Sequence, residues 1–149
     1  MIVVDASVLA DALVDDGPVG DAARAELTGD PHWVAPSHLL VEVMSVIRGK
    51  VLGGKLGLDR AQEAIDALPS LVIDEVGVAM LVDRMWQMRG NVTAYDAAYV
   101  AAAELMACPL VVMVGSPRPA VSAARSDCSP RPDGGRPRIS GPTPLDRPS

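Results

Sequence analysis

The sequence predicts an α/β sandwich with a mainly parallel central sheet. Over residues 1–115, short runs rich in β-branched residues alternate with longer segments that have helical periodicity. This alternation is typical of parallel strands joined by crossover helices. No internal repeat accompanies it, and a segment of this length can bury one hydrophobic core, so we expect a single domain.

Each expected element follows from a local pattern. The strands are the apolar runs at residues 1–5, 32–35, 71–76 and 108–114. The helices are the periodic segments at residues 7–14, 18–28, 36–50, 59–70, 78–90 and 94–106. Pro36 is placed to open the helix at 36–50, and Gly90 is placed to close the helix at 78–90.

The end of the chain differs from the rest. Residues 116–149 hold 8 of the 13 prolines, with 6 basic and 3 acidic groups, whereas residues 1–115 hold 7 basic and 16 acidic groups. The segment has neither a helical nor a strand period. Because it cannot bury enough apolar surface to offset its ordering entropy, we expect a domain at 1–115 and a disordered Pro/Arg/Ser-rich tail at 116–149.

Charge and cysteine content exclude several classes of protein. A formal net charge of −6 argues against a basic nucleic-acid-binding surface, although nucleic acid can still be a substrate. Cys108 and Cys128 match no Cys-x-x-Cys spacing, so neither a disulfide framework nor a thiolate metal site is indicated. No apolar run reaches the roughly 18 residues of a membrane helix, and the first residues do not resemble a signal peptide. We expect a cytoplasmic protein without membrane association.

Three acidic residues are candidates for a functional site. Asp5 directly follows the first strand, where ligands of α/β sheets gather, although it could equally cap the next helix with Ser7. Asp96 lies three residues after Thr93, as in a capping box, and would complement the helix dipole. Glu42 lies on the polar side of its helix, where a solvated surface glutamate would show the same pattern. If the three carboxylates converge, they offer the oxygen ligands that Mg²⁺ prefers, and the ion could activate a water molecule for phosphoryl chemistry.

Three blocks of the sequence resemble a known family. The stretches "MIVVDAS", "APSHLLVEVMSVIRG" and "NVTAYDAAYVAAAE" look like the three acidic blocks of PIN-domain ribonucleases, specifically VapC-type toxins of type II toxin–antitoxin pairs. The resemblance spans about residues 1–112 and implies a PIN-like three-layer sandwich. By resemblance, Asp5, Glu42 and Asp96 are the catalytic, metal-binding acids, with Ser7 and Thr93 as nearby polar support.

The same resemblance implies an activity and partners. The expected protein is an endoribonuclease that needs Mg²⁺ or Mn²⁺ and hydrolyses phosphodiester bonds of single-stranded or loop RNA. A VapB-type antitoxin is expected to cover the metal site, and we expect a homodimer that associates through helices.

The chain departs from the family pattern after its last strand. The family continues with a turn that carries a further acid, then a helix and an edge strand, whereas "CPLVVMVGSPRPAVSAAR" has no acid there. We therefore expect the C-terminal helix and edge strand to be missing and the activity to be impaired. A frameshift would explain this. If the codon of Val112 is GTG, the reading frame that starts two bases later encodes Asp-Gly, and with GC-rich codons the sequence encoded in that frame is "DGRLAAA".

Two other functions stay open at this stage. The chain could be an inactive PIN-fold module that still binds its antitoxin, or an α/β protein with different phosphate chemistry. A haloacid-type phosphatase would have a second aspartate two residues after Asp5, where this chain has Ser7. A phospho-receiver would have an acidic pair at that strand end and a lysine late in the domain, and neither is present.

Overall fold

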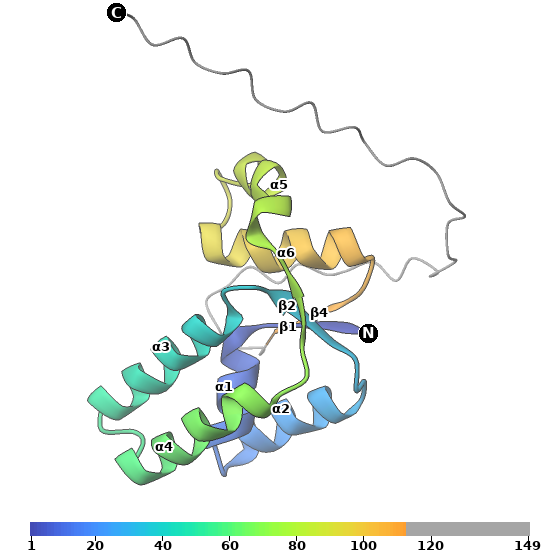
Figure 1. The fold of residues 1–149 in the computed structure, drawn as a ribbon. Coiled ribbons are helices and arrows are strands. Elements are labelled where there is room, and N and C mark those ends of the chain that lie inside the picture. The colour runs from blue at the N-terminus through green and yellow to red at the C-terminus, as the bar shows by residue number, and fades with distance from the viewer. Residues whose placement is uncertain (113–149) are drawn as a thin grey trace, which may run out of the picture.

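A four-stranded sheet lies at the centre of the computed structural model, which describes residues 1–112 (Figure 1). The strands are β1 (Ile2–Val4), β2 (Trp33–Pro36), β3 (Asp74–Val76) and β4 (Leu110–Val111). Their order is β3-β2-β1-β4, and every pairing among them is parallel. The predicted α/β fold with a parallel sheet is confirmed.

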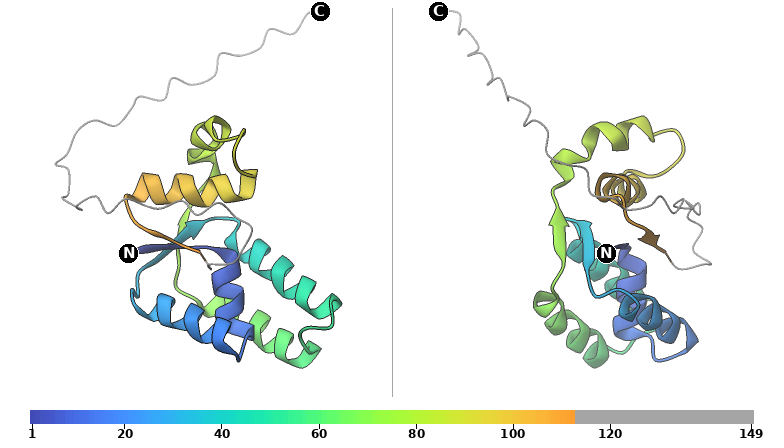
Figure 2. Two further views of the ribbon diagram at one scale, coloured as in Figure 1. Left: turned by 180° about the vertical axis from the view of Figure 1, so that it is seen from behind. Right: turned by 90° about the vertical axis from the view of Figure 1, so that its right-hand side faces the viewer.

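Helices cover both faces of this sheet, so the fold has three layers (Figures 1 and 2). One layer contains α1 (Ala6–Val14), α2 (Pro18–Thr28), α3 (Leu39–Leu52) and α4 (Leu58–Ala67). The other contains α5 (Val82–Gln87) and α6 (Ala94–Met106). Two 3-10 turns, η1 (Leu68–Ser70) and η2 (Val78–Met80), precede and follow β3.

The core forms where the helices meet the two central strands. Val3, Val4 and Val34 have no exposed surface, because a central strand of a parallel sheet is covered on both faces. On the other side of β1 and β2, α6 is buried from Ala97 to Ala103. Its small side chains let the helix backbone approach the sheet closely, so that Tyr99 is the one large residue in that buried run.

Pro36 ends β2, so the prediction that it opens a helix is wrong. Proline has no N–H to donate to the next strand, but the N–H of Ser37 donates to the carbonyl oxygen of Val76 at 2.9 Å and continues the contact with β3. The following helix, α3, begins only at Leu39. Glu42 therefore lies in the first turn of α3 rather than in its second.

Other elements are shorter than predicted. The single helix expected at 78–90 is wrong: η2 and the six-residue α5 occupy this segment, with the buried Leu81 between them. The strand expected at 71–76 is confined to β3, and the described part of the strand expected at 108–114 is confined to β4. The expected tail at 116–149, including the missing helix and edge strand, lies outside the described residues. Within residues 1–112, no helix is both long and apolar enough to cross a membrane.

Candidate active site

Asp5 occupies the carboxyl end of β1 and caps α1. Its Oδ1 atom accepts hydrogen bonds from the backbone N–H of Ser7 at 2.8 Å and from the Ser7 hydroxyl at 2.5 Å. Asp5 is 2% exposed, and among residues 1–112 it is the one charged residue that is buried. Burying a carboxylate is unfavourable unless hydrogen bonds or cations compensate it. The capping interpretation is confirmed, but capping alone does not require such deep burial.

Asp96 lies in the first turn of α6 and interacts with the N-cap residue Thr93. The Thr93 hydroxyl accepts the backbone N–H of Asp96 at 3.2 Å and donates to the Asp96 Oδ2 atom at 2.7 Å. In a capping box the carboxylate would instead accept the N–H of the N-cap residue. The capping role of Thr93 is confirmed, and the carboxylate of Asp96 is held by a hydroxyl group.

Glu42 is not a solvated surface residue. Its side chain is 17% exposed, and its Oε2 atom accepts a hydrogen bond of 2.7 Å from the hydroxyl of Tyr99. The Nε2 atom of His38 lies 3.5 Å from the same oxygen. The surface interpretation of Glu42 is therefore wrong.

All three acids lie toward the edge of the sheet where its strands end. Asp5 directly follows β1, and the neighbouring parallel strand β2 leads into α3, whose first turn holds Glu42. Because α6 runs back toward the start of the parallel strand β4, its N-terminal turn with Asp96 lies at that same edge (Figure 1). The hydrogen bond between Tyr99 and Glu42 joins α6 to α3 there.

The geometry falls short of a preformed metal centre. In the part of the chain that the structure describes, no three His, Cys, Asp or Glu side chains are gathered closely enough to hold a metal ion. What the three acids share is a hydroxyl donor: Ser7 for Asp5, Tyr99 for Glu42 and Thr93 for Asp96.

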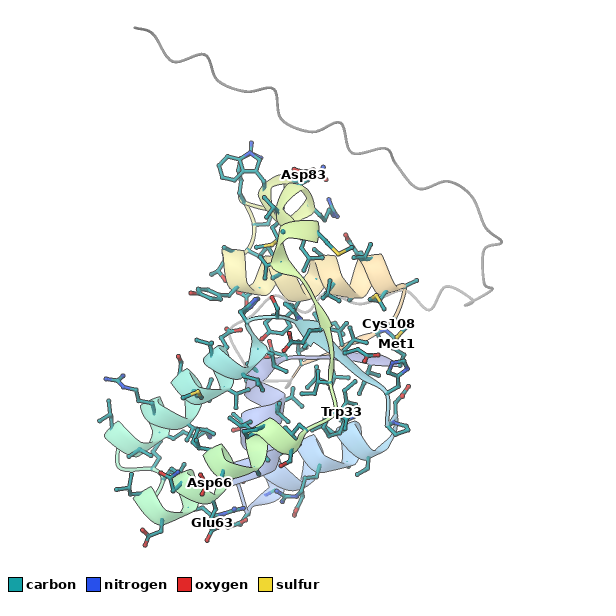
Figure 3. The ribbon with its side chains drawn as sticks, viewed as in Figure 1. Met1, Trp33, Glu63, Asp66, Asp83 and Cys108 are labelled. Carbon is teal, nitrogen blue, oxygen red and sulfur yellow. The ribbon has the colours of Figure 1, made fainter. Side chains whose placement is uncertain are left out.

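Other polar side chains and a hollow of the described surface do not include the three acids. Figure 3 shows Glu63 and Asp66 on the outer side of α4 and Asp83 on α5, pointing away from the sheet. It also shows Cys108 beside Met1, where the parallel strands begin, which is the opposite edge. A hollow of about 190 Å³ lies between β2, α3, η1 and the segment of residues 71–75 that leads into β3. Its lining is largely leucine, isoleucine and proline, and it contains none of the three acids.

Tyr99 and His38 were not predicted as parts of the site. The ring of His38 makes edge-on contacts with Tyr95 at 5.6 Å between centroids and with Tyr99 at 5.5 Å. A signal for Tyr99 was present in the sequence, because it lies three residues after Asp96 in an alanine-rich helix, and a buried tyrosine hydroxyl needs a partner. The signal for His38 was its position four residues before Glu42, which places the two side chains on the same polar side of the predicted helix.

Comparisons with known proteins agree with this architecture. The PIN domain family matches residues 2–114. Ribonuclease VapC9 of Mycobacterium tuberculosis is 37% identical over 111 residues, which cover 74% of this chain and 84% of that protein. Ribonuclease VapC1 of the same organism is 37% identical over 110 residues, which cover 73% and 82%.

A solved structure shows the same fold at lower sequence similarity. The crystal structure of VapC20 from M. tuberculosis, described as a Sarcin-Ricin loop cleaving toxin, superimposes with a TM-score of 0.60 and 18% identity. The match covers 78% of this chain and 92% of that one. With the family match over most of the chain and relatives at 37% identity, the chain belongs to the PIN-domain family, among the VapC ribonucleases.

Proposed function

We propose that this chain is the ribonuclease toxin of a type II toxin–antitoxin pair, with Asp5, Glu42 and Asp96 as its catalytic acids. The observation that carries the assignment is the burial of Asp5 at the carboxyl end of a central strand, where a purely structural aspartate has no need to be buried. The 37% identity to ribonucleases VapC9 and VapC1 supports the activity.

The donor set fits a hard divalent cation. Carboxylate oxygens are the ligands that Mg²⁺ and Mn²⁺ take, and Asp5, Glu42 and Asp96 would hold the ion. When bound, the ion supplies an activated water molecule and neutralises charge on the phosphoryl oxygens. Because like charges repel, the carboxylates are expected to lie farther apart without the ion and to draw together around it.

The hydroxyl groups of Ser7, Tyr99 and Thr93 have an orienting role in this proposal. Each donates to one acid, at 2.5, 2.7 and 2.7 Å respectively. A hydrogen bond of this kind restricts the rotation of a carboxylate and so orients its oxygens for a cation.

The test is cleavage of RNA by the purified full chain in Mg²⁺, in Mn²⁺ and in EDTA. We expect cleavage with either metal and none in EDTA. The Asp5→Asn variant should be inactive, whereas Asp66→Asn, which removes a surface carboxylate of α4, should cleave like the wild type. Cleavage in EDTA, or full activity of Asp5→Asn, would refute the assignment.

The second candidate is an inactive PIN-fold protein that still binds its antitoxin. It is favoured by one observation, the absence of an acid between Cys108 and Arg125, where the family pattern has a further acid. A well-folded wild-type chain that cleaves no RNA but forms a stable antitoxin complex would identify this function.

The proposed partners are a VapB-type antitoxin, RNA and a second copy of the chain, and the proposed location is the cytoplasm. Self-association is supported by exposed apolar side chains along α3, namely Val41, Met44 and Leu52. Co-expression with the product of the neighbouring upstream reading frame tests the antitoxin. Separate elution of the two proteins at micromolar concentration would exclude that partner, and a monomeric mass by light scattering would exclude the dimer.

A further inference from the structure

An exposed aromatic ring lies beside the proposed active site. Tyr95 directly precedes Asp96 in the first turn of α6, and it is 60% exposed. The whole chain has two tryptophans, two tyrosines and no phenylalanine. Of these four aromatic residues, only Tyr95 and Trp86 have largely exposed side chains, and Trp86 belongs to α5.

The ring of Tyr95 is supported from within the site. His38 packs against it with 5.6 Å between ring centroids and an angle of 67° between ring planes. His38 packs in the same way against Tyr99, whose hydroxyl binds Glu42. An edge-on contact orients an aromatic ring while leaving much of its surface open. Tyr95 is thus an oriented, solvent-accessible ring. Its contacts lead through His38 and Tyr99 to the proposed catalytic acid Glu42.

We propose that Tyr95, supported by His38, is a stacking site for one nucleobase of a single-stranded RNA substrate. The proposal rests on the ribonuclease function proposed above. Single-stranded RNA is bound in many proteins by stacking its unpaired bases on aromatic side chains. Because Tyr95 packs against His38, whose Nε2 atom lies 3.5 Å from the Oε2 atom of Glu42, the stacked base belongs to a nucleotide next to the phosphate that the carboxylates approach.

The acidic charge of the protein makes a stacking contact with RNA more important for affinity. Residues 1–115 hold 7 basic and 16 acidic groups, so few cations are available there to pair with the phosphates of RNA. Stacking on an aromatic ring is nearly independent of net charge, and every base has a face that can stack. A stacking site near the proposed catalytic acids would therefore add RNA affinity that does not depend on basic residues.

The first test measures binding of a short single-stranded RNA to the full chain in EDTA, where no cleavage occurs. Tyr95→Ala should weaken the Kd about tenfold, whereas Tyr95→Phe, which keeps the ring, should stay within about twofold of the wild type. The matched control is Trp86→Ala, which removes the other exposed aromatic ring and should leave the Kd unchanged. An unchanged Kd in Tyr95→Ala, or an equal loss in Trp86→Ala, would overturn the stacking site.

The second test changes the RNA, so its first measurement uses only the wild-type protein. A series of oligonucleotides, each with one abasic position, should reveal one position whose base contributes about tenfold to wild-type affinity. For the oligonucleotide that is abasic at that position, Tyr95→Ala and the wild type should have the same Kd, because there is no base left to stack. Equal effects of all abasic positions would overturn the proposal.

Failure of this site and failure of the ribonuclease function give different results. If the wild type cleaves RNA and Tyr95→Ala binds RNA normally, only the stacking site is overturned. If Tyr95→Ala binds RNA normally but no longer forms the antitoxin complex, the ring is a protein contact, which also overturns the proposal. A wild type that neither binds nor cleaves RNA overturns both.

Discussion

The hydroxyl of Tyr99 donates a hydrogen bond of 2.7 Å to the Oε2 atom of Glu42. The bond joins two helices that cover opposite faces of the sheet, α6 and α3 (Figure 1). Tyr99 is 1% exposed and the side chain of Glu42 is 17% exposed, so little water competes for this contact. A hydrogen bond in such surroundings is stronger than one at the surface, and its loss leaves a carboxylate without that donor.

Removal of this hydroxyl in Tyr99→Phe should affect both stability and metal binding. We expect the free energy of unfolding in urea to fall by about 1–2 kcal/mol, because a half-buried carboxylate loses a donor. The affinity for Mg²⁺, measured by calorimetry, should fall severalfold because Glu42 is no longer oriented. Tyr95→Phe, which removes a hydroxyl from an exposed ring, is the control and should change neither quantity. A Tyr99→Phe variant with wild-type Mg²⁺ affinity would show that Tyr99 has a structural role only.

Asp96→Asn should separate the capping role of Asp96 from metal binding. Asparagine keeps the shape of the side chain and loses the charge, so the cost in stability should be on the order of 1 kcal/mol, from the dipole and capping contributions. Divalent-ion binding should nevertheless weaken and RNA cleavage should be abolished, as in Asp5→Asn. If calorimetry finds unchanged metal affinity in both Asp5→Asn and Asp96→Asn, the site assignment is contradicted. Asp66→Asn, which removes a surface carboxylate, is the control and should keep the wild-type metal affinity.

Gly20 is required by the corner between α1 and α2. A Cβ atom at this position would lie 1.7 Å from the carbonyl oxygen of Asp15, a backbone atom that also accepts a hydrogen bond from Arg24 at 2.8 Å. Gly20→Ala should therefore destabilise the fold by on the order of 3 kcal/mol, measured by urea denaturation. Gly49→Ala is the matched control: beyond its chain neighbours and the nearby backbone of its own helix, no atom lies within 4 Å of its Cβ position, and this change within α3 should raise stability by up to about 1 kcal/mol.

The ion pair between Arg84 and Glu104 gives a pH dependence with a defined sign. Hydrogen bonds of 2.6 and 2.8 Å from Arg84 hold the pKa of Glu104 below its ordinary value of 4.5. A lowered pKa in the folded state stabilises the protein above the unfolded-state pKa, and this contribution disappears as the pH falls through the folded-state value.

Glu104→Gln should reveal this contribution by urea denaturation at two pH values. Because both side chains are nearly half exposed, the loss near neutral pH should be a few tenths to about 1 kcal/mol. Wild type and variant should become equally stable at acid pH, where Glu104 is protonated. Glu63→Gln, which removes a longer 3.4 Å pair with Arg60, should have a smaller effect. A difference that persists at acid pH would mean that the ion pair is not its cause.

The frameshift interpretation makes a prediction about the gene itself. Methionine has one codon, so the hidden Asp-Gly pair across Val112, Met113 and Val114 exists only if the codon of Val112 is GTG. The family match ends at residue 114, and the separate match to VapC9 covers 84% of that protein. Any other codon for Val112 removes the aspartate. A one-base correction that restores "DGRL" should raise Mg²⁺-dependent RNA cleavage, and a well-folded corrected chain without any gain would show that this acid is dispensable.

The sequence predicted which helices and strands exist better than it predicted the residues at which they begin and end. The valines of β1 and the Thr93 cap of α6 are local signals, and both were interpreted correctly. Pro36 was misplaced because a proline suits the end of a strand as well as the start of a helix, and the pairing of Ser37 with β3 decides between them. The segment at 78–90 has a helical period that does not show its interruption at Leu81.

The sequence indicates the three candidate acids but not the contacts that their side chains make. Asp5, Glu42 and Asp96 were candidates because of their places relative to strands and helices. The contact of Glu42 with Tyr99 depends on how α3 and α6 pack across the sheet edge, which no local pattern encodes. Periodicity could not show that Glu42 is half-buried, because it describes one helix at a time.

The order of the strands also has a consequence for synthesis on the ribosome. β1, which ends at Asp5, pairs on one side with β2 and on the other with β4, so Val3 and Val4 have their partners at Leu110 and Val111. Contacts between such distant residues form late, because the intervening chain must first be made and ordered. The strand that leads to the buried aspartate is therefore completed only after nearly the whole domain has emerged. A nascent chain of this protein would have no assembled candidate site near the translation machinery until that last pairing closes the sheet.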